Sequence, residues 1–257
     1  ANEYYGNKIV IDEFLTFEMM SSQLAEGKSD ASIMAIENSI AGSIIPNYAL
    51  IDEYNLSIVG ECHLKISHNL LALENQSIDD IKEVHSHPMA LLQCRDFFKK
   101  YPKIKLVEGT DTALSAKEIY INNVKGRAAI ASTLASDLYS LDILAKNIQT
   151  IKNNETRFVI LERSTLNSKS KFNKASIKFE LDHKRGSLAT ILNVMSDCKM
   201  NLTKIQSIPK IETPWRYSFF VDITFGSVDD YFKVKSIIEI MAKDFKVLGE
   251  YNNSKND

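Results

Sequence analysis

Three adjacent side chains in the stretch NNETRFVIL, residues 153–161, could do chemistry together. Thr156 has a hydroxyl, Arg157 a permanent positive charge and Phe158 an aromatic ring, and an apolar run follows them. A positioned hydroxyl can donate a proton, and a guanidinium can bind a carboxylate through two parallel hydrogen bonds. The alternative is that these residues form the ordinary end of a buried strand.

Hydroxyl and amide side chains recur where predicted strands end and helices begin. They are Asn38, Ser39, Ser86, Thr112 and Ser132. Each can be a helix N-cap, which satisfies backbone N–H groups in the first helical turn. If several helix starts converge instead, their N–H groups and dipoles favour an anion. Together with Arg157, the pattern predicts a small anionic ligand and no metal.

Common catalytic motifs are absent from the chain. The sequence contains no GxGxxG, GxxxxGK[ST], GxSxG or HExxH. Nucleotide cradles, the usual serine hydrolase site and a zinc protease site are therefore not predicted. His85 and His87 form a strand-like pair two residues apart, and we expect them to be weak metal ligands. A reaction here would use hydroxyls, an arginine and dipoles, without a cofactor.

The elements that must position these groups alternate in the first two-thirds of the chain. Extended or strand segments are predicted at 31–39, 56–73 and 156–163, and a helix at 41–54. Strand–turn–helix units are predicted at 77–101, 103–122 and 127–141. Such units form an α/β sheet with helices on its faces, and ligands bind where its strands end.

The last third has a different order. The polar stretch 162–174 predicts a linker, which we place at 166–174. Strands at 174–181, 201–209, 215–225 and 246–251 alternate with helices at 186–199 and 228–245. This βαββαβ order predicts a ferredoxin-like unit over residues 175–257.

Bulk composition fits a globular protein in a reducing cytoplasm. The 257 residues carry a net charge of −2 and include 44% hydrophobic residues. No basic block predicts nucleic-acid binding, and no apolar run predicts a membrane span or a signal sequence. Cys62, Cys94 and Cys198 are far apart, so neither a disulfide framework nor a zinc site is expected.

Several motifs together resemble the catalytic domain of prephenate dehydratase. They are AIENSIAGSI (35–44), HNLLAL (68–73), SHPMALLQC (86–94), GTDTALSAKE (109–118), AAIAS (128–132) and NNETRFVIL (153–161). The stretch 186–209 resembles the ACT regulatory domain that is attached to these enzymes. The order and spacing match over nearly the whole first two-thirds of the chain, which makes the resemblance specific.

The resemblance implies a fold and an activity. The expected fold is a two-lobed α/β catalytic domain, like a periplasmic binding protein, over residues 1–165, followed by the ACT domain. The lobes are expected at about 1–75 with 150–165, and at 76–149. The implied reaction converts prephenate to phenylpyruvate with loss of water and carbon dioxide, in phenylalanine biosynthesis. Aromatisation of the ring drives this reaction, so no cofactor or metal is needed.

The resemblance also implies roles for single residues. Thr156 would donate to the departing hydroxyl, and Arg157 would hold a substrate carboxylate. Glu37 would orient its neighbours, because a further anion near two carboxylates opposes binding. The cleft lining is expected to consist of Asn38, Ser39, Ser86, Thr112, Ala113, Ser132 and Phe158.

This chain departs from the family pattern at several positions. Family members begin with a strand and a turn of the kind QGxxGxxS, and residue 1 is expected to fall in the helix after them. Met89 stands where Gln is usual, and Leu114 where Gly is usual. The usual ESRP reads QSIP at 206–209, so the charged pair is lost and altered effector selectivity is expected.

Regulation is a further expectation from the ACT resemblance. We expect a homo-oligomer, a dimer or tetramer, that binds L-phenylalanine between ACT domains. The contacts would come from Gly186, Ser187 and Leu188 of one subunit and from Asn201 and Leu202 of the facing subunit. The alternative is that the glycine only makes a turn and the asparagine only caps a strand.

Two other functions compete with prephenate dehydratase. An arogenate dehydratase would act on the substrate that has an amino group in place of the keto group. A non-catalytic module would use the same lobes to capture an amino acid or anion. The Thr156–Arg157 pair favours an enzyme.

Overall fold

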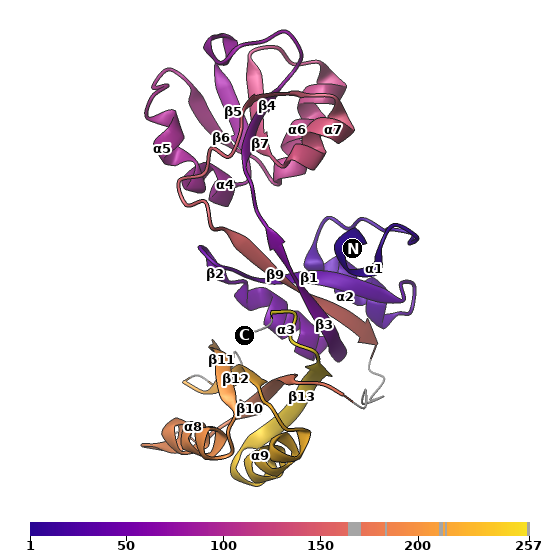
Figure 1. Ribbon diagram of the computed structural model, residues 1–257, viewed down its shortest axis with the longest axis vertical. Helices are drawn as coiled ribbons and strands as arrows, with labels where there is room; N and C mark the ends of the chain where they lie inside the picture. The colour runs from indigo at the N-terminus through magenta and orange to yellow at the C-terminus, as the bar shows by residue number, and fades with distance from the viewer. Residues whose placement is uncertain (164–170, 183, 211–212, 214, 256–257) are drawn as a thin grey trace. The chain divides into compact units, whose positions relative to one another are not determined.

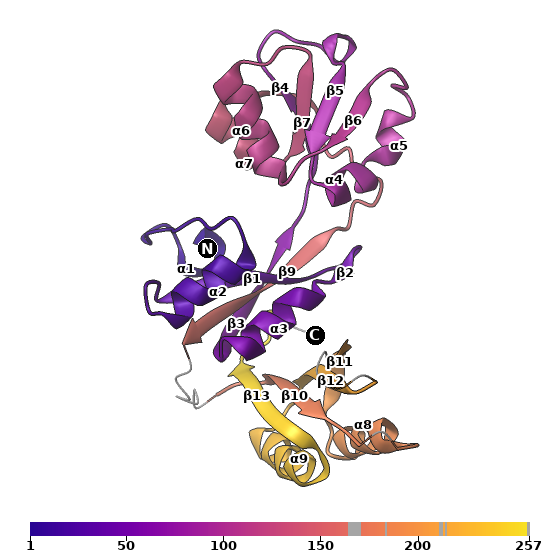
Figure 2. The same cartoon turned by 180° about the vertical axis from the view of Figure 1, so that it is seen from behind.

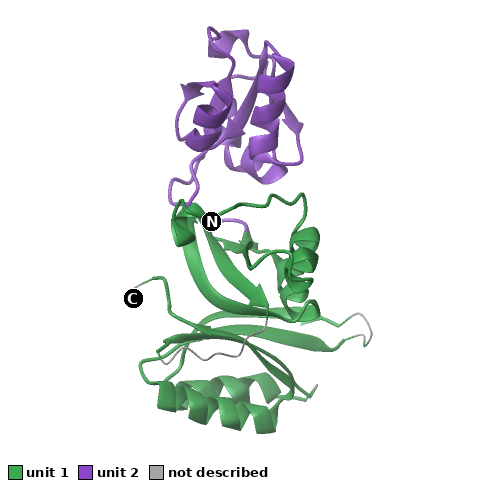
Figure 3. Cartoon of the chain, turned by 90° about the vertical axis from the view of Figure 1, so that its right-hand side faces the viewer, with its two compact units in different colours: residues 1–38, 42–64, 156–257 green, residues 39–41, 65–155 purple. Residues whose placement is uncertain are grey.

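The computed structural model describes residues 1–163, 171–182, 184–210, 213 and 215–255 (Figure 1). Most of the predicted linker 166–174 lies outside the described residues. The chain forms two compact units, which Figure 3 colours separately. Unit 1 comprises residues 1–38, 42–64 and 156–257, and unit 2 comprises 39–41 and 65–155. The chain thus passes between units near residues 65 and 155, where the sequence predicted lobe boundaries near 75 and 150.

Unit 1 contains one sheet built from the N-terminal segments and the strand that carries Thr156. The strand order is β2-β1-β9-β3. The strands are β1 (Ala31–Asn38), β2 (Gly42–Ser43), β3 (Leu56–Lys65) and β9 (Glu155–Arg163). The helices are α1 (Asn2–Tyr5), α2 (Phe17–Ala25) and α3 (Ile45–Glu53). Apolar residues of α2, α3 and the strands, including Leu24, Ile51 and Val159, form its core.

The register between β1 and β9 determines where the candidate catalytic side chains point. The strands are antiparallel, with Asn38 opposite Thr156 and Glu37 opposite Arg157. A register irregularity lies between Ala35 and Glu37. Bulges of this kind are common next to active sites, where they redirect side chains. Because successive side chains of a strand point to opposite faces, Thr156 and Arg157 face opposite sides of this sheet.

Unit 1 also contains the predicted βαββαβ segment, which is confirmed. Its sheet has the antiparallel order β11-β12-β10-β13. Its elements are β10 (Lys174–Glu180), α8 (Ser187–Asp197), β11 (Asn201–Pro209), β12 (Tyr217–Thr224), α9 (Val228–Met241) and β13 (Lys243–Tyr251).

The two faces of this ferredoxin-like sheet have different neighbours. Helices α8 and α9 cover one face (Figures 1 and 2), and an apolar core that includes Phe179, Ile191 and Val234 lies beneath them. On the other face, Phe220 and Leu248 pack with core residues of the first sheet. Helix α9 ends at Met241 rather than at residue 245, because the chain turns at Ala242 to begin β13.

Unit 2 is an α/β sheet with the strand order β6-β5-β7-β4-β8. Its strands are β4 (Asn69–Ala72), β5 (Glu83–Ser86), β6 (Lys105–Glu108), β7 (Arg127–Ala131) and β8 (Asp142–Ala145). Its helices are the 3-10 helix η1 (Ile78–Asp80), α4 (Pro88–Gln93), α5 (Arg95–Phe98), α6 (Thr112–Asn122) and α7 (Thr133–Tyr139). The predicted α/β class is confirmed, while β8 was not predicted.

None of the helices in the described part of the chain has both the length and the apolar character needed to cross a membrane.

Candidate active site

Thr156 and Asn38 form a hydrogen-bonded pair on one face of the β1–β9 ladder. The Asn38 side-chain amide donates to the Thr156 hydroxyl over 3.0 Å. Both residues are half-buried. Since the hydroxyl oxygen accepts this bond, its own hydrogen can be donated to a third group. The amide would also stabilise negative charge on the threonine oxygen as that proton leaves.

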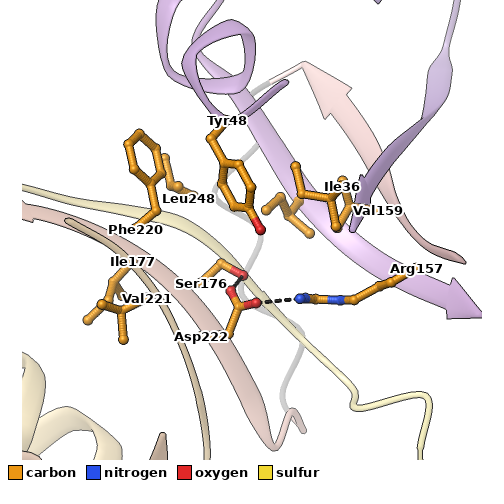
Figure 4. A pocket seen from close by; sticks show the side chains of 11 residues that line it. Ile36, Tyr48, Arg157, Val159, Ser176, Ile177, Phe220, Val221, Asp222 and Leu248 are labelled. Atoms are coloured by element: carbon orange, nitrogen blue, oxygen red, sulfur yellow. Dashed lines mark hydrogen bonds and ion pairs between the residues drawn. The ribbon is translucent and has the colours of Figure 1, made fainter. Parts of the chain in front are cut away.

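Arg157 faces the opposite side of the ladder and enters a buried polar cluster. Its Nε donates to Glu61 Oε2 at 2.7 Å, its Nη1 to Asp222 Oδ2 at 2.5 Å, and its Nη2 to the Tyr251 hydroxyl at 2.9 Å. Figure 4 shows the guanidinium directed at Asp222. Ser176 donates to the other Asp222 oxygen at 2.5 Å.

This placement corrects the expectation that Arg157 clamps a substrate carboxylate. Only 7% of the residue is exposed, and all three guanidinium nitrogens have partners within the protein. A clamp needs donors that face the ligand. Arg157 instead joins the strand that carries Thr156 to β3, β12 and β13.

The cluster around Arg157 balances its charges. Burial opposes the positive charge, but Asp222, Tyr251 and Glu61 outweigh this and raise the pKa of Arg157 well above its ordinary value. Burial likewise acts to raise the pKa of Glu61, but Arg157 and Lys174 overcome it and hold that pKa below its ordinary value. Lys174 Nζ lies 2.9 Å from both Glu61 oxygens. Arg157 and Glu61 are therefore both held in their charged forms.

Sequence reasoning missed Glu61 and Asp222. Each is a single acid inside a mostly apolar strand segment, in SIVGEC and in FFVDIT. Because an isolated buried carboxylate is costly, such an acid signals a buried cation. That signal was available in the sequence, but the choice of Arg157 as the cation was not.

Ser39 and Phe158 occupy different environments. The Ser39 hydroxyl accepts from the Glu155 backbone N–H at 2.9 Å, and its own N–H donates to the Glu155 carbonyl at 2.8 Å. Ser39 therefore fixes the backbone at Glu155, the residue immediately before Thr156. Phe158 is half-buried opposite Ala35, and it projects from the same face of β9 as Thr156.

Unit 2 carries the other predicted lining residues at one edge of its sheet. Strands β5, β6 and β7 are parallel neighbours, so their carboxyl ends share that edge. The Ser86 side chain is fully buried and donates to the Ile130 carbonyl at 2.7 Å, which gives it a structural role. Ser132 is the N-cap of α7, as the capping alternative stated. Thr112 and Ala113 open α6 after the true cap, Asp111.

The predicted effector residues lie at two places in the ferredoxin-like segment. Gly186, with φ +84°, is the N-cap of α8, and a left-handed φ of this kind favours glycine. Ser187 and Leu188 follow it and line a pocket of about 170 Å³. Asn201 and Leu202 begin β11, where Asn201 donates to Thr224 at 3.4 Å.

Among the described residues, no group of three or more histidine, cysteine or acidic side chains is arranged to hold a metal ion. Cys62, Cys94 and Cys198 are unpaired thiols.

The chain matches one protein-family model and several curated sequences. The family model described as prephenate dehydratase matches residues 1–166. A bifunctional chorismate mutase/prephenate dehydratase of Buchnera aphidicola subsp. Acyrthosiphon pisum is 33% identical over 96% of this chain and 65% of its own length. The arogenate dehydratase/prephenate dehydratase 2 of Arabidopsis thaliana is 37% identical over 98% of this chain and 68% of its own length. The chain thus spans about two-thirds of the length of these relatives.

Solved structures show the same fold. A protein described as GqqA, a novel type of quorum quenching acylase, has a TM-score of 0.87 at 25% identity and covers 99% of this chain and 93% of its own. The Arthrobacter aurescens prephenate dehydratase in complex with L-Phe has a TM-score of 0.83 at 24% identity, over 93% of this chain and 80% of its own. The likeness supports the two-lobed architecture predicted from the sequence.

Proposed function

The chain belongs to the prephenate dehydratase family, and we propose on this basis that it converts prephenate to phenylpyruvate. The observation that carries the proposal is the Thr156 hydroxyl, which accepts from Asn38 and keeps its own hydrogen to donate. The chemistry requires one such donor, because the ring hydroxyl of the substrate must leave as water.

The atoms and electrons of this reaction balance without a cofactor. The bond between the ring and its carboxylate breaks, and carbon dioxide leaves. The electron pair of that bond enters the ring, the ring carbon–oxygen bond breaks, and the hydroxyl takes the Thr156 proton to become water. The resulting threonine alkoxide is stabilised by the Asn38 amide, and solvent returns the proton. Positioning in a site that excludes water makes a weak acid such as threonine effective.

The test is Thr156→Val, which keeps the shape of the side chain and removes its hydroxyl. The turnover number should fall by about 10²–10⁴-fold, the usual contribution of a positioned proton donor, while substrate binding changes little. Thr156→Ser retains the hydroxyl and is the matched control, which should keep most of the activity. Near-normal turnover by the valine variant would remove Thr156 from the mechanism.

Arogenate is the second candidate substrate, because an Arabidopsis relative is named for both activities. The two substrates differ only in an amino or keto group on the side chain, away from the reacting ring. The ratio of kcat/KM for arogenate and prephenate, measured on the same preparation, decides between them. Binding of either substrate without product formation would instead favour the non-catalytic module.

L-phenylalanine is the proposed effector, held between the ferredoxin-like segments of a homo-oligomer. The left-handed Gly186 at the start of α8 supports this proposal, since backbone N–H groups there suit a carboxylate. The Arthrobacter aurescens structure of the same fold is described as a complex with L-Phe. The unpaired state of the three cysteines supports a reducing cytoplasm as the location.

A further inference from the structure

Two ion pairs connect the ladder that carries Thr156 to the ferredoxin-like sheet. Glu37 and Arg157 are opposite each other in the β1–β9 ladder, and Lys204 and Asp222 are opposite each other in the β11–β12 ladder. Lys204 Nζ lies 2.6 Å from Glu37 Oε1, and Arg157 Nη1 lies 2.5 Å from Asp222 Oδ2. We call these four residues the ion bridge.

The ion bridge is adjacent to the candidate catalytic pair along both strands. Asn38 follows Glu37 on β1, and Thr156 precedes Arg157 on β9. The two bridge residues point to one face of the ladder, and Asn38 with Thr156 points to the other. A displacement of the bridge is therefore transmitted through a single peptide unit on each strand to the Asn38–Thr156 hydrogen bond.

Burial makes the bridge sensitive to loss of one member. The side chains of Lys204, Arg157 and Asp222 are only 7%, 8% and 6% exposed, while that of Glu37 is 36% exposed. Removing one partner of a buried pair leaves an uncompensated charge, which is strongly unfavourable. The four charges therefore hold the β1–β9 ladder and the β11–β12 ladder in a fixed position relative to each other.

A further hydrogen-bond donor lies beside the bridge, at Tyr48 on α3. Its hydroxyl is buried and has no hydrogen-bond partner in the described part of the chain. It lines a small cavity together with Arg157, Ser176 and Asp222, and Figure 4 shows the hydroxyl directed toward Ser176 and Asp222. If Arg157 withdraws, Tyr48 can donate to Asp222 in its place.

The strand that carries Lys204 also begins with the proposed effector residues. Asn201 and Leu202 open β11, and Lys204 follows two residues later. The register of β11 against β12 is irregular between Leu202 and Lys204. A ligand that shifts the start of β11 therefore acts close to the Lys204–Glu37 pair.

We propose that the ion bridge of Glu37, Lys204, Arg157 and Asp222 positions Thr156 and Asn38 for the reaction and couples them to the ferredoxin-like domain. This inference rests on the proposed function for its rate effects. All four are positioning residues, since they act through their neighbours. An effector that binds one state of β11 more tightly shifts the position of Thr156 through the bridge.

Charge exchange across the Glu37–Lys204 pair tests the proposal. Glu37→Lys and Lys204→Glu should each lower kcat by about tenfold or more with little change in KM, and the double variant should recover most of the loss, since residues in one ion-pair network are strongly coupled. Glu37→Gln and Lys204→Met replace them if a reversed charge prevents folding. A double variant that is no better than the worse single variant overturns the proposal.

A matched control lies on the same face of the same sheet. Lys178 on β10 pairs with Asp52 on α3 at 2.7 Å, and neither residue lies on β1 or β9. Asp52→Asn should leave kcat within about twofold of wild type, because the Lys178–Asp52 pair is not part of the ion bridge and is not expected to be coupled to it. An equal loss of kcat in this variant would show that the whole interface, not the ion bridge, sets the rate.

A second readout separates this inference from the proposed function. The Asn38 side-chain amide signal in an NMR spectrum reports its bond to Thr156 without any substrate. It should shift in Glu37→Gln and stay in place in Asp52→Asn. If wild type fails to convert prephenate but the amide shifts in this way, the proposed function falls and the positioning role stands. An unshifted amide in Glu37→Gln overturns the positioning role.

Discussion

Replacement of Glu61 by glutamine tests the buried cluster that supports β9. The Glu61 side chain is fully buried; it accepts from Arg157 at 2.7 Å, from Lys174 at 2.9 Å and from the Ser254 backbone N–H at 3.1 Å. Glutamine keeps the shape but turns an N–H₂ group toward one of the two cations. Breaking a buried pair costs about 3–5 kcal/mol, so the free energy of unfolding should fall by that amount.

The assay is urea unfolding followed by circular dichroism at pH 7. Glu83→Gln is the control, because Glu83 is 36% exposed; it lies 3.0 Å from His85 and 3.8 Å from both Lys105 and Arg127. That surface change should cost less than about 1 kcal/mol. A loss in Glu61→Gln no larger than in the control would refute the assignment of a buried, charged Glu61.

The difference in unfolding free energy between wild type and Glu61→Gln should depend on pH, and that dependence tests the direction of the Glu61 pKa shift. The cluster holds the pKa of Glu61 below its ordinary value of 4.5. A group whose folded pKa is lowered contributes stability above its unfolded pKa and loses it as pH falls through the folded pKa. The stability gap between wild type and Glu61→Gln should therefore stay constant near neutral pH and narrow below about pH 4.5. A gap that widens with acid would show a raised pKa instead.

Three further substitutions have defined outcomes. Gly249→Ala places a methyl group 2.1 Å from the Ile58 carbonyl oxygen and should lower the free energy of unfolding in urea by about 1–3 kcal/mol. A smaller loss would show that β13 can move away from Ile58. Ser86→Ala removes the hydrogen bond to the Ile130 carbonyl and should cost about 0.5–1.5 kcal/mol; an unchanged midpoint would argue against that bond. Gly186→Val strains a left-handed φ of +84° and should weaken phenylalanine binding in calorimetry with phenylalanine, tyrosine and tryptophan. If wild type binds none of the three, the effector proposal fails.

The side chains at the helix starts of unit 2 were predicted from local sequence only in part. The sequence located hydroxyls at strand–helix junctions and offered capping as one alternative, which holds for Ser132. It did not separate Thr112 from the true cap Asp111, because the two residues are adjacent at the helix start and both side chains can accept a hydrogen bond. It also could not show that Ser86 turns inward to Ile130, since that carbonyl belongs to a strand 44 residues away.

Strand alternation is a local property that already bears on Thr156 and Arg157, which are neighbours on one strand. Adjacent residues of one strand face opposite sides, so a shared site for both was already disfavoured. What the sequence determined by itself was the α/β class of residues 77–141, the βαββαβ segment and the strand that carries Thr156, because hydrophobic periodicity and turn residues are local properties. Only the tertiary structure decided that Arg157 meets Asp222 and Glu37 meets Lys204. Those pairs join residues 65 or more positions apart, and their choice depends on how two sheets pack and on the cost of leaving a buried charge alone.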